Sequence, residues 1–192
     1  MSGVASWAVF LRNASMLESA AASFENGRGN GRLDHYVYPS GQAQESGRDQ
    51  GHTQDGLEHL LETALAYWKA TGDPRLLQRQ HFLLRRGLEY TARYNLNVSV
   101  PFEYRCDVYN ISCWHNISAK GRGEFTHMWE MAAAVYGDDA PYTQKVRYLP
   151  GYAPEGCAPP AIGDVHCGDG PPGQGTLTFY GMKPPQWGKF SL

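Results

Sequence analysis

The sequence has no long hydrophobic run, no excess of positive charge and few cysteines. No stretch of its 192 residues approaches the roughly 18 consecutive apolar residues that a membrane-spanning helix needs. Lys and Arg total 17 against 19 Asp and Glu, and the net charge of −2 argues against a general nucleic-acid binder. Neither pair of its four cysteines has the spacing of a zinc knuckle, and no other cluster of metal ligands stands out. We therefore expect no metal and no cofactor.

Two features that are present are typical of secreted proteins. The cysteines form two close pairs, Cys106 with Cys113 and Cys157 with Cys167, and this spacing suits local disulfides. Four Asn-X-Ser sequons are potential glycosylation sites, at Asn13, Asn97, Asn110 and Asn116. Free thiols and chance sequons are the alternative interpretation. The first residues lack the basic start and apolar centre of a signal peptide. We expect a secreted protein whose natural N-terminus lies upstream of residue 1.

Apolar residues recur at helical spacing in four segments. Helices are expected over about 4–24, around an apolar stripe at 57–68, over about 75–94 and around 125–136, with a short one after Asp139. Gly72 should end the second helix, with Asp73 as the N-cap and Pro74 as the first residue of the third. The third helix has apolar residues on two faces, which predicts a position between two layers.

The connections between these helices alternate between short turns and long polar loops. Residues 95–123 form a long irregular stretch, and loops of that length inside a domain are usually functional. The pattern predicts an all-α fold of antiparallel helical hairpins. Because so few helices cannot close a ring, we expect an incomplete (α/α) toroid over residues 1–149. A Pro- and Gly-rich tail, 150–192, follows it and holds one strand-like run, "GTLTFYG".

The segment "GQAQESGRDQGHTQ", residues 41–54, is crowded with amides and with charges of both signs. Either these groups are buried and satisfy one another, or they face a polar ligand. His52 lies at the start of the second helix, where the helix dipole disfavours a protonated imidazole and leaves a neutral ring as a base. Glu45 would oppose that effect if it lay close, and Arg48 and Asp49 can pair with each other.

Two further clusters lie in the long loop. "VPFEYRCDVY" carries the phenols Tyr104 and Tyr109, and "ISAKGRGEF" places Lys120 and Arg122 before the fourth helix, where an anion could also meet backbone N–H groups. The alternatives are packed aromatic rings for the two tyrosines and a solvated basic turn for the two cations.

Three quoted stretches together resemble a known family. "YPSGQAQESGRDQGHTQ", "LEYTARYNL" followed by "VPFEY", and "ISAKGRGEF" followed by "WEM" are similar to the alginate lyase-type polysaccharide lyases of the (α/α) toroid class. Within that class they are most similar to the group that acts on alginate or glucuronan. The resemblance covers roughly residues 1–136 and the run "GQGTLTFYG". Its most specific motif is Glu-Ser-Gly-Arg-Asp-Gln-Gly-His.

The resemblance implies cleavage of a uronate polymer by β-elimination, without a metal. The proton at C5 is removed and the C4–O bond breaks, while the substrate carboxylate is neutralised. The implied catalytic residues are His52, Glu45 and Tyr104. Six residues are implied to bind substrate: Gln44, Arg48, Gln50, Tyr109, Lys120 and Arg122. Tyr109 is also the second choice for the catalytic phenol. Gln44, Arg48 and Gln50 would shape the subsite or hold the loop. The implied partner is an anionic uronate polysaccharide, with neither nucleic acid nor a membrane expected.

The family's neutralising Asn, near a Trp, precedes the helix that begins this chain, so we expect a C-terminal fragment of a lyase that lacks part of its groove. Two other function classes stay open. A glycoside hydrolase on a helical toroid would need two carboxylates, for which Glu45 and Asp49 are the candidates. A non-catalytic carbohydrate-binding relative would bind without turnover.

Overall fold

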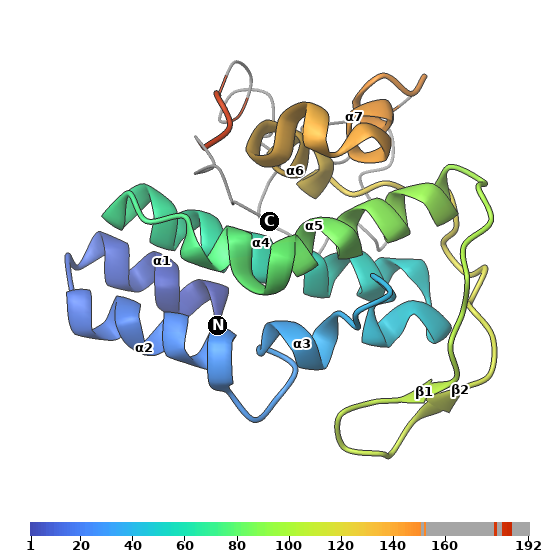
Figure 1. Ribbon diagram of the computed structural model, residues 1–192, viewed down its shortest axis with the longest axis horizontal. Coiled ribbons are helices and arrows are strands. Elements are labelled where there is room, and N and C mark those ends of the chain that lie inside the picture. The colour runs from blue at the N-terminus through green and yellow to red at the C-terminus, as the bar shows by residue number, and fades with distance from the viewer. Residues whose placement is uncertain (151, 153–178, 180–181, 186–192) are drawn as a thin grey trace, which may run out of the picture.

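The computed structural model describes residues 1–150, 152, 179 and 182–185, and within them the chain is almost entirely helical (Figure 1). The α-helices are α1 (Ser2–Phe10), α2 (Ala14–Asn26), α3 (Leu33–Tyr36), α4 (Gln50–Thr71), α5 (Arg75–Asn95), α6 (Met128–Tyr136) and α7 (Pro141–Arg147). Two 3₁₀ turns, η1 (Gln44–Gly47) and η2 (Gly137–Asp139), and two short strands, β1 (Arg105–Cys106) and β2 (Cys113–Trp114), complete the described part. The all-α prediction is confirmed there. "GTLTFYG", except for Phe179, and the Cys157–Cys167 pair lie outside the described residues.

The single first helix predicted over about 4–24 is wrong, because the chain breaks between α1 and α2. Arg12 takes a left-handed conformation with φ 53°. Asn13 then begins a new helix, since its side chain accepts a hydrogen bond from the backbone N–H of Met16 at 3.0 Å. Asn is among the strongest N-cap residues, and the cap satisfies one of the donors left unpaired at the new helix start.

The predictions for α4 and the turn after it hold closely. Its apolar stripe is buried from Leu57 to Leu65, and Gly72 ends the helix in the left-handed region at φ 76°. The next cap lies one residue later than predicted, at Pro74. Asp73 still satisfies a backbone donor at the start of α5, because its Oδ1 accepts a hydrogen bond from the Arg75 N–H at 2.9 Å.

The α5 helix lies between layers, as its two apolar faces predicted. Leu76, Leu77, Leu83 and Leu84 are all buried, and α5 packs against α4 on one side and α7 on the other. The helix is interrupted at Arg79–Phe82, where the backbone leaves helical geometry. In Figure 1 α6 and α7 lie on one side of the α4–α5 pair, and α1 to α3 lie on the other.

The outer face of α1 exposes several large apolar side chains. Small residues, Ala5 and Ala8, face the interior. Trp7 and Phe10 stay 59% and 75% exposed. No helix among the described residues is long and apolar enough to cross a membrane.

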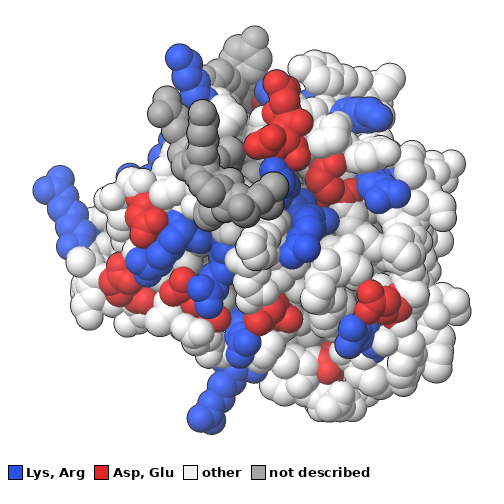
Figure 2. All heavy atoms as spheres, in the orientation of Figure 1, with Lys and Arg blue, Asp and Glu red and all other residues white. Residues whose placement is uncertain are grey.

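Charged side chains of both signs are interspersed on the face drawn in Figure 2. Over the part of this face that the structure describes, neither sign forms a continuous patch. The functional site therefore has to be found from local groups rather than from an overall field.

Candidate functional site

Four glutamines from the 41–54 segment are buried, and we call them the glutamine row: Gln42, Gln44, Gln50 and Gln54. Gln42 binds the backbone of Glu103 twice, because its Nε2 donates to the carbonyl at 2.9 Å and its Oε1 accepts from the N–H at 2.8 Å. Gln44 Oε1 accepts from the N–H of Val108 at 3.0 Å. These side-chain amides bind backbone groups of the loop, as a neighbouring strand would do in a sheet.

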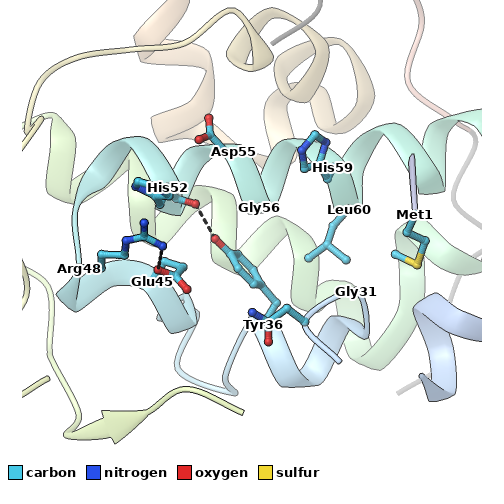
Figure 3. A pocket seen from close by; sticks show the side chains of 11 residues that line it. Met1, Gly31, Tyr36, Glu45, Arg48, His52, Asp55, Gly56, His59 and Leu60 are labelled. Atoms are coloured by element: carbon cyan, nitrogen blue, oxygen red, sulfur yellow. Dashed lines mark hydrogen bonds and ion pairs between the residues drawn. The ribbon is translucent and has the colours of Figure 1, made fainter. Parts of the chain in front are cut away.

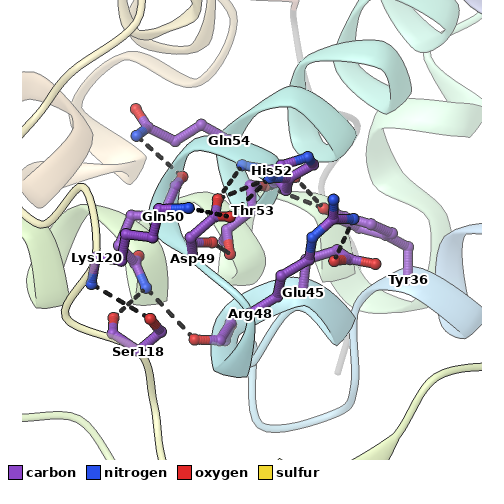
Figure 4. A network of polar contacts seen from close by, with 11 residues as sticks. Tyr36, Glu45, Arg48, Asp49, Gln50, His52, Thr53, Gln54, Ser118 and Lys120 are labelled. Carbon is purple, nitrogen blue, oxygen red and sulfur yellow. Dashed lines mark hydrogen bonds and ion pairs between the residues drawn. The ribbon is translucent and has the colours of Figure 1, made fainter. Parts of the chain in front are cut away.

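The other half of the glutamine row fixes the far end of the same loop (Figure 4). Gln50 Nε2 donates to the Ser118 carbonyl at 3.0 Å, and Gln50 Oε1 accepts from Asn95 Nδ2 at 2.9 Å. Gln54 Oε1 accepts from Trp129 Nε1 at 2.7 Å, and Gln54 Nε2 donates to the Glu124 carbonyl at 2.8 Å. Buried amides with their partners in place specify one arrangement of an irregular chain.

Gln44 and Gln50 therefore hold the loop, which is one of the two roles expected for them. Both side chains are at most 2% exposed. Their amide groups are engaged within the protein, and neither residue lines the pocket described below.

The loop that the glutamine row fixes carries a disulfide-closed hairpin. Cys106 and Cys113 are bonded, as predicted, and their Cα atoms are 3.9 Å apart in the β1–β2 pair. Asp107 accepts backbone N–H bonds from Ile111, Ser112 and Tyr109, and these bonds lower the pKa of its carboxyl. The hairpin is thus a preorganised loop rather than a loose connection.

The two candidate phenols lie at different places on this hairpin, and both are exposed. The ring of Tyr104 stacks on His115, with centroids 4.6 Å apart. The hydroxyl of Tyr109 reaches Gly29, where a Cβ would lie 3.1 Å from the phenol oxygen. Asn30, the next residue after Gly29, lines the pocket, whereas neither Tyr104 nor Tyr109 is among the lining residues.

An open pocket of about 340 Å³ runs along the exposed face of α4 (Figure 3). Its lining residues are Met1, Asn30, Gly31, Tyr36, Glu45, Arg48, His52, Asp55, Gly56, His59 and Leu60. Tyr36 donates its hydroxyl to the carbonyl of His52 at 2.8 Å, and burial raises the pKa of this phenol well above its usual value. A Cβ on Gly56 would lie 2.0 Å from the Tyr36 ring, so the close approach requires glycine there.

The polar end of the pocket holds His52, Glu45 and Arg48, three of the predicted site residues. Arg48 pairs with Glu45 at 3.4 Å rather than with Asp49, and both partners come from η1 and its C-cap. Asp49 instead binds the imidazole of His52, with Nδ1 at 2.9 and 2.8 Å from the two carboxylate oxygens. The carboxylate bound to His52 is therefore that of Asp49, while Glu45, which was considered as a possible neighbour of the ring, pairs with Arg48.

Asp49 is held ionised by this contact. Burial raises the pKa of its carboxyl, but the bonds from the backbone N–H and the ring of His52 outweigh burial, with help from the charges of His52 and Lys120. The net result is a lowered pKa for Asp49. The same carboxylate caps α4 by accepting the His52 N–H at 2.8 Å.

The two cations of the "ISAKGRGEF" cluster have different surroundings. Lys120 is exposed, and its Nζ lies 4.0 Å from Asp49 Oδ2, at the edge of the histidine site. Arg122 stacks its guanidinium on the Tyr94 ring at 4.0 Å and donates to the Tyr94 carbonyl at 2.9 Å. Lys120 is placed to meet an anion near His52, whereas the guanidinium of Arg122 already has partners in the protein.

The sequence interpretation missed four polar residues of the pocket: Asn30, Tyr36, Asp55 and His59. Asp55 and His59 follow His52 at i+3 and i+7 on α4, so helical periodicity could have found them. Asn30 has no such signal. Its side-chain Oδ1 is a buried acceptor that has no hydrogen-bond partner within the described residues.

Among the described residues, no group of three or more His, Cys, Asp or Glu side chains is arranged to hold a metal ion. Comparison of the chain with protein-family models, with curated proteins and with solved structures found no match. The chemistry of the site must therefore be argued from its own residues.

Proposed function

We propose that this chain is part of a polysaccharide lyase that cleaves uronate-containing polymers, alginate or glucuronan, by β-elimination, and that its helical hairpins belong to an (α/α) toroid. The observation that carries the proposal is the polar end of the α4 pocket. A histidine ring bound to a buried carboxylate lies there beside the guanidinium of Arg48. A base next to a cation is what removal of a proton from the carbon beside a carboxylate requires.

In the proposed reaction the sugar carboxylate displaces Glu45 from Arg48. The Arg48–Glu45 contact is long at 3.4 Å and half-exposed on the arginine side, so the exchange costs little. His52 takes the C5 proton, the electron pair forms the C4=C5 double bond, and the C4–O glycosidic bond breaks. The leaving oxygen receives a proton from a phenol, and Asn30 lines the pocket that would hold the substrate.

Tyr109 is the phenol with the better position for this role. Neither tyrosine lines the pocket, but the Tyr109 hydroxyl approaches Gly29, the residue before Asn30 of the lining, whereas Tyr104 stacks on His115. The sequence ranked Tyr104 first, and the geometry favours the reverse order. Replacing each with Phe separates them, since only the proton donor should lower turnover strongly.

A glycoside hydrolase is the second candidate, because two carboxyl groups, Glu45 and Asp55, line the pocket. Such an enzyme needs one protonated acid and one ionised carboxylate. Asp49, named with Glu45 on sequence grounds, does not suit the acid role, since its pKa is lowered. A hydrolase would lose activity in Glu45→Gln and Asp55→Asn and would form no unsaturated product.

The deciding experiment follows ultraviolet absorbance of the unsaturated uronate while the chain is incubated with glucuronan and with alginate. A lyase gives a rising signal that falls at least about 100-fold in His52→Ala. His81→Ala, an exposed histidine on α5 outside the pocket, is the matched control and should keep the wild-type rate. Folding of each variant is checked by circular dichroism. Reducing ends without absorbance would support the hydrolase, and binding without any product would support the non-catalytic relative.

A further inference from the structure

We infer that Asp49 is a positioning residue that holds His52 in its Nδ1–H tautomer and thereby makes Nε2 the proton acceptor of the site. The acceptor role rests on the proposed lyase function, whereas the tautomer follows from the contacts of the two residues alone. Neither the resemblance nor the sequence assigned a role of this kind to Asp49.

The tautomer follows from what a carboxylate can do. Nδ1 of His52 lies 2.9 Å from Oδ1 and 2.8 Å from Oδ2 of Asp49. An ionised carboxylate only accepts hydrogen bonds, so the nitrogen facing it must carry the hydrogen. A neutral imidazole has one N–H, and the hydrogen bond at one nitrogen fixes the state of the other. Nε2 of His52 therefore has the free lone pair.

Asp49 is itself fixed, so the orientation it imposes is rigid. Its side chain is 9% exposed. Its Oδ1 also accepts the backbone N–H of His52 at 2.8 Å, and its carbonyl accepts from Thr53 Oγ1 at 2.7 Å. Figure 4 shows the carboxylate enclosed between the start of α4 and the ring of His52. Lys120 approaches to 4.0 Å from the exposed side and favours the ionised form.

The other ring nitrogen belongs to a side chain that lines the pocket. The His52 side chain is 47% exposed, and Nε2 makes no hydrogen bond within the described part of the chain. The second histidine of the pocket differs, because Nδ1 of His59 is shared between Ser2 Oγ at 3.2 Å and Glu62 Oε2 at 3.3 Å. The carboxylate of Glu62 also favours a hydrogen on Nδ1 of His59, but this contact is longer than that of Asp49 with His52, and the Glu62 side chain is 24% exposed against 9% for Asp49.

A proton taken up by Nε2 turns the ring into an imidazolium that still donates Nδ1–H to Asp49. The negative carboxylate then stabilises the new positive charge, and Asp49 keeps its own ionised state. Removing the carboxylate should lower turnover more than substrate affinity, since the contact matters most when the ring is charged.

The test uses two variants that keep the helix cap. Ser and Asn are both favourable N-caps, so Asp49→Ser and Asp49→Asn should fold, while Ser is too short to reach the ring and Asn has no charge. Ring nitrogen NMR shifts of ¹⁵N-histidine protein are recorded at a pH where His52 is neutral. We expect an unprotonated Nε2 and a protonated Nδ1 in the wild type, and loss of this state in Asp49→Ser. A wild-type ring with Nε2–H, or an Asp49→Ser ring unchanged from wild type, would overturn the inference.

Kinetics on the same variants distinguish the inference from the proposed function. If the chain is a lyase, Asp49→Asn should lower kcat by about 100-fold or more with little change in KM, as for the orienting carboxylate of other histidine bases. A rate within a few-fold of wild type would overturn the positioning role. If no variant and no wild-type sample makes unsaturated product, while the NMR result is as expected, the tautomer assignment stands and the lyase proposal fails.

Discussion

The segment from residue 41 to residue 54 has two sides that use similar polar residues for opposite purposes. On the buried side, the glutamine row is satisfied by the backbone of the long loop. On the open side, Glu45, Arg48 and His52 line a pocket and keep bonding capacity for a ligand. The sequence left open whether these groups are satisfied within the protein or face a ligand. The buried side has its partners within the protein, and the open side faces the pocket. The difference between the sides is burial, which makes each hydrogen bond on the inner side necessary for stability.

The largest effect should come from breaking the buried side at Gln54. Gln54→Ala removes the acceptor of Trp129 Nε1 and the donor to the Glu124 carbonyl, and it leaves the indole N–H buried without a partner. We expect a loss of about 3 kcal/mol in the free energy of unfolding. Urea denaturation measures it, and Arg48→Ala on the open side is the control at under about 1 kcal/mol. Equal losses in the two variants would mean that the two sides do not differ as described.

The next largest loss of stability should come from removing the disulfide in the loop that the glutamine row binds. Replacing Cys106 and Cys113 with Ser removes the constraint on the hairpin. The short closed loop predicts a loss of about 2 kcal/mol on the chain-entropy model. Because the glutamine row binds the loop outside the hairpin as well, the variant should stay folded and keep the nuclear Overhauser contacts between Gln54 and Trp129. Loss of those contacts would show that the disulfide, not the glutamine row, orders the loop.

The sequence alone could predict the helices, because their apolar stripes are local. It could not separate the two sides of the 41–54 segment. Gln44 and Gln50 bind partners 64 and 68 residues away in the sequence. The residue type alone does not tell whether a glutamine binds backbone or substrate. The pairing of Asp49 with His52 was within reach, since an Asp three residues before a His at a helix start is placed by the cap itself. The sequence analysis considered Glu45 only as a group that would act on His52 if it lay close, and it paired Asp49 with Arg48 instead.

The break between α1 and α2 shows a similar limit. Apolar periodicity runs across residues 11–13, and only the cap chemistry of Asn13 opposes it. The pocket was also beyond prediction, because Asn30 and Tyr36 reach it from a loop and a short helix that show no periodic pattern.

A smaller effect on stability distinguishes the uncharged hydrogen bonds that α4 makes from its ion pairs. The amides of the glutamine row do not titrate, whereas His127 pairs with buried Glu58 at 3.0 Å. The Glu58 contact raises the pKa of His127 against the opposing effect of burial, with smaller contributions from Glu62 and Asp55. A raised folded-state pKa gives stability that is fully present below the ordinary value of 6.5 and is lost as pH rises through the folded value.

Unfolding free energies measured from pH 6 to pH 9 test this contribution. We expect a decline with rising pH in the wild type and a flatter profile in His127→Gln, while Gln54→Ala should shift the whole curve without changing its slope. A wild-type profile that rises over this range would contradict the assigned sign.

The smallest effect concerns stability on the exposed face of α1, where burial gives no stabilisation to lose. Trp7→Ser and Phe10→Ser remove the two large side chains of that face and leave Ala5 and Ala8 packed as before. The free energy of unfolding should change by no more than about 0.5 kcal/mol, the range for surface substitutions. Solubility should rise, because a contiguous exposed apolar patch promotes association. A loss of several kcal/mol in urea denaturation would mean that the two rings are covered in solution, and would place α1 with the buried side of the comparison.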